Sequence, residues 1–172
     1  MNQIESIDKI LTARRQALGP DYNAYANHAK RVFLIAEQLG ARNNRDEMAI
    51  AAAFHDVGIW THESWDYLEP SNTEALKFIQ ENELMVNQEL VESMIMNHHK
   101  ITAVGNDLIT EAFRKADLID FSKHSIRYGL RKKWLKSLMD NYPWHNFHRV
   151  LVNKFLKYAW QNPLRPLPMM RW

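Results

Sequence analysis

Apolar residues recur every three or four positions along most of the 172-residue chain, the spacing that places them on one face of an α-helix. In one such stripe, Val32 and Ile35 face the same side, and Gly40 follows where the helix is expected to end. The first stripe stops at Gly19 and Pro20. The pattern predicts helices over residues 2–18, 25–39, 45–57, 71–81, 87–99, 107–121, 124–139 and 144–160.

The segments between these helices show no convincing alternation of the kind that a β-strand requires. Ser71 and Glu74 match a capping box, in which the two side chains satisfy backbone donors at the start of a helix. Three prolines between residues 163 and 168 exclude a regular helix in the tail, 162–172. No repeat or linker divides the chain. We therefore expect an all-α fold with a single domain over residues 1–172.

Composition narrows the class of protein. The chain contains no cysteine, which excludes disulfides, thiolate metal sites and a cysteine nucleophile. No apolar run approaches the roughly 20 residues that span a bilayer, and the charged N-terminus is unlike a secretory signal. The net charge is +2, and the basic run at 123–136 is typical of a solvated helix face. We therefore expect a cytoplasmic protein with no DNA, RNA or membrane partner.

His55 and Asp56 stand at the end of a predicted helix, directly after the apolar residues 51–54. The side chains of adjacent helical residues point about 100° apart, so the two reach one point mainly near a helix end. A carboxylate beside such an apolar segment needs a partner if it is buried. A metal ion or a strong hydrogen-bond network would provide that partner.

Three further polar residues lie on the inward faces of other predicted helices. His28, His98 and Asp117 each stand four positions from an apolar residue of their own stripe. His99 is rotated about 100° from His98 and is the weaker inward candidate. Nitrogen and oxygen donors without sulfur suit divalent Mn, Co, Fe, Zn or Mg ions.

The order of these residues resembles the signature of the HD superfamily of metal-dependent phosphohydrolases. The surrounding segments are similar as well: NHAKRVFLIAEQL, AIAAAFHDVGIW, MIMNHHKI and FRKADLIDFS. What the resemblance implies is one divalent metal ion held by four residues, which are His28, His55, Asp56 and Asp117.

The resemblance covers about residues 23–125 and leaves 126–172 as C-terminal helices and a proline-rich tail. It implies a bundle of about seven to nine helices. Dinuclear members of the family place two further histidines between the HD pair and the last aspartate. His98 matches the second of these, but Asn72 stands at the position of the first and offers only one neutral oxygen. We therefore expect one metal ion, with His98 as a substrate contact or proton donor, or as a ligand if a second ion binds. His62 could replace the missing ligand.

The resemblance also implies hydrolysis of a phosphate ester, from a nucleotide or another small molecule, by a metal-activated water. Asp56 or Asp117 would accept a hydrogen bond from that water in addition to binding the metal. Arg31 and Arg114 are candidates to hold the phosphate, because charge that develops on its oxygens requires fixed cations. The favoured alternative for each is a surface arginine whose charged end lies in water.

The loop after the HD pair offers further candidates. His62, Glu63 and Asp66 are candidates for acid–base or substrate-selecting roles. Three aromatic side chains of this loop either stack on a base or sugar or anchor the loop in the core: Trp60, Trp65 and Tyr67. The tail and the basic run 123–136 are expected either to cover the site or to form a homo-oligomer interface.

Three other functions fit the same residues. A dinuclear iron oxygenase would need six ligands, of which five are convincing. A metal-dependent hydratase or lyase would use the same activation of water. A nucleotide-binding regulatory module without turnover would have less reason to keep all four core ligands. Fold resemblance by itself does not decide among these reactions.

Overall fold

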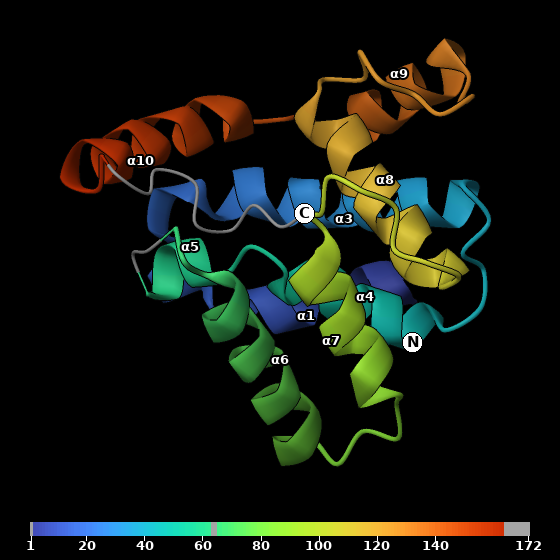
Figure 1. The fold of residues 1–172 in the computed structure, drawn as a ribbon, viewed down its shortest axis with the longest axis horizontal. Helices are drawn as coiled ribbons and strands as arrows, with labels where there is room; N and C mark the ends of the chain where they lie inside the picture. Colours follow the sequence, from blue (N-terminus) through green and yellow to red (C-terminus); the bar gives the residue numbers. More distant parts are fainter. Residues whose placement is uncertain (1, 63–64, 164–172) are drawn as a thin grey trace.

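A computed structural model describes residues 2–62 and 65–163 of the chain (Figure 1). Within these residues every regular element is helical, and none is a strand. The all-α prediction is confirmed, and apart from the single-turn helices α2 and α5 the helices correspond to the predicted ones. The elements are α1 Gln3–Thr12, α2 Arg15–Leu18, η1 Gly19–Asp21, α3 Tyr22–Gln38, α4 Arg45–Phe54, α5 Gly58–Thr61, α6 Leu68–Glu81, α7 Gln88–Asn97, α8 Leu108–Phe121, α9 Lys132–Asn141 and α10 Phe147–Gln161.

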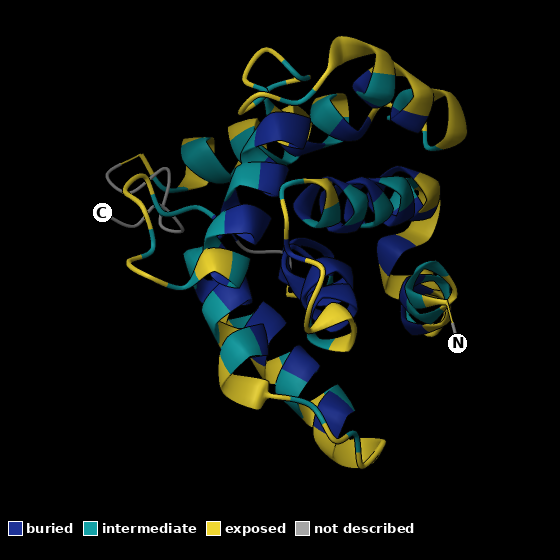
Figure 2. Ribbon diagram, turned by 90° about the vertical axis from the view of Figure 1, so that its right-hand side faces the viewer, coloured by how far each residue is buried: buried dark blue, intermediate teal, exposed yellow. Residues whose placement is uncertain are grey.

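Helix α4 lies in the middle of the bundle. Its residues from Met48 to Phe54 are all buried, including three consecutive alanines at 51–53. Small side chains allow neighbouring helices to approach closely, and α4 packs against α1, α3, α6 and α7. Figure 2 shows the buried faces of the helices turned toward this interior.

Helix α3 is the second central element, and it packs against α8, α4 and α1. Helices α6 and α7 pack on each other as a hairpin that extends from one side of the bundle (Figure 1). Helix α10 lies at the edge and packs mainly against α3. The arrangement brings α3, α8 and the C-terminal ends of α4 and α7 together, which is where the site lies.

Several helix boundaries follow from side chains that the sequence makes available. Asn2, Asn87 and Asp107 each accept hydrogen bonds from backbone N–H groups at the first turns of α1, α7 and α8. The predicted first helix is interrupted, because α1 ends at Thr12 and α2 begins at Arg15.

The predicted capping box is wrong. Helix α6 already begins at Leu68, so Pro70 lies in the first turn, where its missing N–H is not needed. Ser71 is fully buried inside this helix, and its hydroxyl accepts a hydrogen bond from the backbone N–H of Gly58 at 3.0 Å. Ser71 therefore links α6 to the start of α5 and does not cap the N-terminus of α6.

The C-terminal part also differs from the prediction. Helix α9 begins only at Lys132, because His124 and Tyr128 adopt positive φ angles in the turns before it. The last helix begins at Phe147. The part of the tail from 164 to 172 lies outside the described residues. Across residues 2–62 and 65–163, no helix combines the length and apolar character that crossing a bilayer requires.

Candidate metal centre

The His55-Asp56 pair occupies the turn between α4 and α5, as its position at a helix end predicts. The Tyr25 hydroxyl holds this turn, because it donates to Ala53 O at 3.0 Å and accepts from the N–H of Asp56 at 3.2 Å. Gly58 lets α6 approach, since a Cβ atom there would lie 2.7 Å from Tyr67 O. The backbone around the pair is thus fixed by direct contacts.

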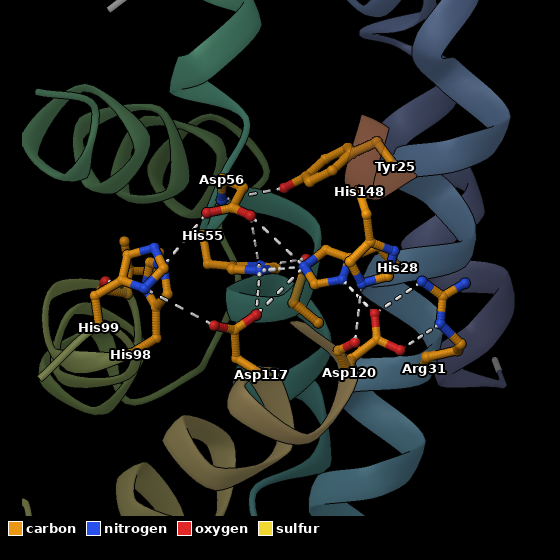
Figure 3. A network of polar contacts seen from close by, with 12 residues as sticks. Tyr25, His28, Arg31, His55, Asp56, His98, His99, Asp117, Asp120 and His148 are labelled. Atoms are coloured by element: carbon orange, nitrogen blue, oxygen red, sulfur yellow. Dashed lines mark hydrogen bonds and ion pairs between the residues drawn. The ribbon is translucent and has the colours of Figure 1, made fainter. Parts of the chain in front are cut away.

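Four side chains converge beside this turn, from α3, the α4–α5 turn and α8 (Figure 3). His28 Nε2 lies 2.9 Å from His55 Nε2, 3.6 Å from Asp56 Oδ2 and 3.4 Å from Asp117 Oδ1. His55 Nε2 lies 3.5 Å from Asp56 Oδ2 and 3.7 Å from Asp117 Oδ1. None of the four residues is more than 5 % exposed.

These residues fit a divalent cation. Metal–ligand bonds of about 2.0–2.2 Å place neighbouring ligand atoms roughly 3 to 3.6 Å apart, close to the separations observed here. Two buried, ionised carboxylates carry more negative charge than one protonated imidazole balances, so the site favours a further positive partner. Asp56 Oδ1 supports this further, because it is buried and has no hydrogen-bond partner among the described residues. A set of nitrogen and oxygen donors suits Mn²⁺, Co²⁺, Fe²⁺ or Zn²⁺ well.

The histidine tautomers are set by acceptors on the outer side of each ring. His28 Nδ1 donates to Asp120 Oδ2 at 2.8 Å, and His55 Nδ1 donates to Ala52 O at 3.0 Å. His98 Nδ1 donates to a backbone carbonyl in the same way, at 2.7 Å. All three rings therefore direct Nε2 toward the cluster, which is how outer partners prepare histidines to bind a metal.

The carboxylates of the cluster are ionised. Burial raises the pKa of Asp56, but the neighbouring histidines outweigh it and hold this pKa well below its usual range. The pKa of Asp117 is lowered for the same reason. Burial lowers the pKa of His28, but hydrogen bonds to Asp120 and Asp56 raise it to about 9. Metal ligands of this kind bind in their deprotonated form, so an ion would displace a proton from His28.

Two more histidines border the cluster. His98 Nε2 lies 3.3 Å from Asp56 Oδ1 and has no hydrogen-bond partner among the described residues. His99 lies closer to the cluster than its position on the helix predicted, because its Nδ1 is 4.0 Å from Asp117 Oδ2. His99 Nε2 is 2.6 Å from the hydroxyl of Tyr67. Burial lowers the pKa of His99 to about 4, so this ring is neutral.

The structure gives Arg31 a role other than the predicted one. Its Nε and Nη2 donate to both oxygens of Asp120 at 2.6 and 2.8 Å, and Nη1 donates to the carbonyl of Tyr142 at 3.0 Å. Arg31 is fully buried, so all its nitrogens serve this internal network and none is available to a phosphate. Arg114 donates twice to Glu111 but lines the cavity described below.

The candidate residues of the loop after the HD pair also differ in whether they reach the site. His62 is exposed and contacts Thr61 and Glu74 instead of the buried cluster, so it does not replace a ligand. Glu63 lies outside the described residues, and Asp66 is exposed. Two of the aromatic residues, Trp65 and Tyr67, line the cavity, whereas Trp60 donates to Asp21 and anchors the loop. Asn72, at the expected position of a second metal ligand, is buried within α6.

A cavity of about 720 Å³ opens onto the cluster. His28, Asp56 and Asp117 lie at its inner end, beside His98 and His99. Its remaining wall comes from α5, the loop before α6, the segment after α7, α8 and α10. A small organic molecule of ordinary size could therefore reach the cluster.

Sequence reasoning missed Asp120 and the contribution of α10. Asp120 stands one turn after Asp117 on α8, so its spacing could have indicated that it shares the buried face. Phe147, at the start of α10, stacks on the ring of His28 with 4.1 Å between the centroids. Nothing in the local pattern around Phe147 predicts that contact, because it depends on how α10 folds back onto α3.

Comparisons with known proteins agree with this geometry. The family model of the HD domain matches residues 25–121, more than half of the chain, and this range contains all four converging residues. No curated protein and no solved structure matched the chain. The matched range, together with the buried His and Asp cluster, shows that the chain belongs to the HD domain family.

Proposed function

We propose that this protein is a metal-dependent phosphohydrolase that cleaves a phosphate ester of a small molecule. The observation that carries the proposal is the convergence of His28, His55, Asp56 and Asp117, three of which line the cavity: His28, Asp56 and Asp117. The HD family implies a bound divalent metal, and the donor set fits one. We infer that these four residues are its ligands.

A metal ion in this position supplies a polarised phosphoryl oxygen and a bound water of lowered pKa. In the overall reaction the water oxygen forms a new bond to phosphorus, the ester P–O bond breaks, and the leaving oxygen takes up a proton. Asp56 and Asp117 each have a second carboxylate oxygen that can accept a hydrogen bond from the attacking water.

Other residues of the chain would bind and orient the substrate. His98 directs Nε2 into the cluster, where this atom can contact the phosphoryl group. Burial lowers the pKa of His98, but Asp56 raises it above its usual value, so the ring can carry the second proton that Nε2 would give to the leaving oxygen. Lys100 and Lys123 line the cavity and provide positive charge. His99, held by Tyr67, is a neutral neighbour that can donate to the phosphate from Nδ1.

The test combines metal content with phosphate release. Protein purified without chelator is analysed for bound metal and assayed on phosphate esters with Mn²⁺, Co²⁺ or Mg²⁺. For Asp56→Asn we expect loss of the metal and a fall in activity beyond the roughly 10- to 100-fold that outer partners of a metal cause. The control Asp140→Asn alters an exposed aspartate on α9 that pairs with Lys136. Unchanged metal content and activity in Asp56→Asn would contradict the proposal.

A second candidate function rests on another group of possible ligands in the same cluster. Ligand atoms of His98, His99 and Asp117 lie within 4.8 Å of one another and could hold another ion beside the first. Two adjacent ions would fit a dinuclear iron oxygenase. Two irons per chain, together with oxygen consumption on an organic substrate, would favour this candidate over hydrolysis of phosphate esters.

A further inference from the structure

The cavity has an apolar wall on the side of α10. Phe147, Leu151 and Phe155 are spaced by four residues and therefore share one face of this helix, which borders the cavity. Val152 extends the same wall toward the opening. Because Phe147 stacks on His28, the apolar surface continues to the edge of the metal cluster.

The facing walls are apolar as well. Trp65 meets Phe155 edge to face, with 5.6 Å between the ring centroids, so the loop before α6 and α10 are in contact and form one continuous side of the cavity. Ile59 and the α8 residues Leu118 and Phe121 cover further parts of the wall. Away from the cluster, an occupant would therefore meet mainly carbon atoms.

Positive charge around the cavity is limited. Among the described residues that line it, the cationic ones are Lys100, Arg114 and Lys123. The guanidinium of Arg114 already donates to both carboxylate oxygens of Glu111 and to the carbonyl of Lys100. A phosphate monoester carries close to two negative charges, which the metal and two lysines can balance, but a polyphosphate chain would exceed them.

Hydrogen-bond partners are limited too. The hydroxyl of Tyr67 is already engaged with His99, and a ring nitrogen of His148 with the carbonyl of Asp120. A sugar or nucleobase placed against α10 and Trp65 would lose hydrogen bonds to water without regaining them from the wall. An aryl or alkyl group in the same place loses none.

We propose that the substrate is a phosphate monoester of an apolar alcohol or phenol. Its phosphate lies at the cluster, and its apolar group lies against the apolar wall that α10, Trp65, Leu118 and Phe121 form. This substrate class rests on the proposed phosphohydrolase function and specifies it, because it disfavours nucleotides and sugar phosphates.

The first experiment measures kcat/KM for ethyl, butyl and hexyl phosphate with Mn²⁺, next to a nucleoside monophosphate and a hexose phosphate. Burial of each added methylene should raise kcat/KM by roughly three- to fourfold. A flat series, or higher kcat/KM for the nucleotide or the hexose phosphate, would overturn the proposed substrate class.

Two matched variants on α10 test the location of the apolar group. Val152 lines the cavity and is 53 % exposed, whereas Leu156 is 58 % exposed and is not among the lining residues. Val152→Gln should lower the ratio of kcat/KM between hexyl and ethyl phosphate several-fold, and Leu156→Gln should leave the ratio unchanged. Equal ratios in both variants would overturn the placement against α10.

Non-hydrolysable phosphonates test the binding of the apolar group independently of the proposed hydrolysis. Calorimetry with Mn²⁺ compares binding of hexylphosphonate and ethylphosphonate, whose C–P bond cannot be hydrolysed. Tighter binding of hexylphosphonate, without phosphate release from any ester, would support the apolar site and contradict the phosphohydrolase. Equal binding of the two phosphonates, with phosphate release mainly from nucleotides, would support hydrolysis and overturn the apolar substrate.

Discussion

The two ends of the cavity are built in different ways. At the inner end, the ligand side chains come from α3, α8 and the turn after α4, and none of the four is more than 5 % exposed. At the outer end, α10 packs mainly on α3, and its lining residue Val152 is more than half exposed. Under the proposed function, the core of the bundle would fix the chemistry, whereas a helix at its edge would select the substrate.

This difference has a physical origin. A buried polar network is stable only when each of its members is satisfied, so a change in one residue affects the others. An apolar wall depends on area and shape and has no such requirement for matched partners. If α10 selects the substrate as proposed, substitutions on α10 would change the preferred substrate without disturbing the cluster.

The largest expected effect follows from Asp120→Ala, which removes the partner of both Arg31 and His28. Arg31 would be left buried without a negative charge, and breaking a buried pair in this way costs about 3–5 kcal/mol of unfolding free energy. Loss of the hydrogen bond to His28 Nδ1 should also weaken metal binding by about 10- to 100-fold. Urea unfolding and a metal titration measure the two effects.

The double variant Arg31→Met with Asp120→Ala serves as the control. It removes the unpaired charge along with its partner, so much of the stability should return while the metal affinity stays low. If Asp120→Ala alone left both stability and metal affinity unchanged, the inner end would not be the tightly coupled network described here.

The residues of the inner end also show what sequence can predict. Helical periodicity placed His28 and Asp117 on inward faces, and the end of an apolar helix placed His55 and Asp56 beside them. The apolar stripe of each helix identifies its buried face, and these residues lie on or next to that stripe. Their convergence was an expectation from the family resemblance, and in the structure the Nε2 atoms of His28 and His55 each lie 3.4–3.7 Å from an oxygen of Asp56 and of Asp117.

The errors concern residues whose partners are distant in the sequence. Arg31 does face inward, as its spacing from His28 indicates, but its partner Asp120 lies 89 residues further along the chain. Ser71 fits a local capping box, yet its hydroxyl is used by Gly58 of another element. Local pattern predicts the face on which a side chain lies, but a tertiary partner decides its role.

A smaller effect is expected from Gly58→Ala, which tests how tightly the turn after the HD pair is held against α6. The added Cβ would lie 2.7 Å from the backbone oxygen of Tyr67 and 2.9 Å from Ser71 Oγ, so the backbone must shift. Such overpacking costs about 1–3 kcal/mol. We expect a lower melting temperature and weaker metal binding, because the shift moves His55 and Asp56. A variant with the stability and metal affinity of the original protein would show that the turn tolerates displacement.

The smallest effect on stability is expected at the outer end, from Phe155→Ala. Phe155 is only partly buried on a peripheral helix, and its ring contacts Trp65 within the wall of the cavity. Its removal should change the unfolding free energy by about 1 kcal/mol or less, well below the usual cost of truncating a buried phenylalanine. Metal content should stay the same, because the residue does not touch the cluster, whereas discrimination between hexyl and ethyl phosphate should decrease. Unfolding curves, metal analysis and the two kcat/KM values give three independent readouts. If metal binding or overall stability fell as far as in Asp120→Ala, the two ends of the cavity would form one cooperative unit, and α10 could not change selectivity independently of the chemistry.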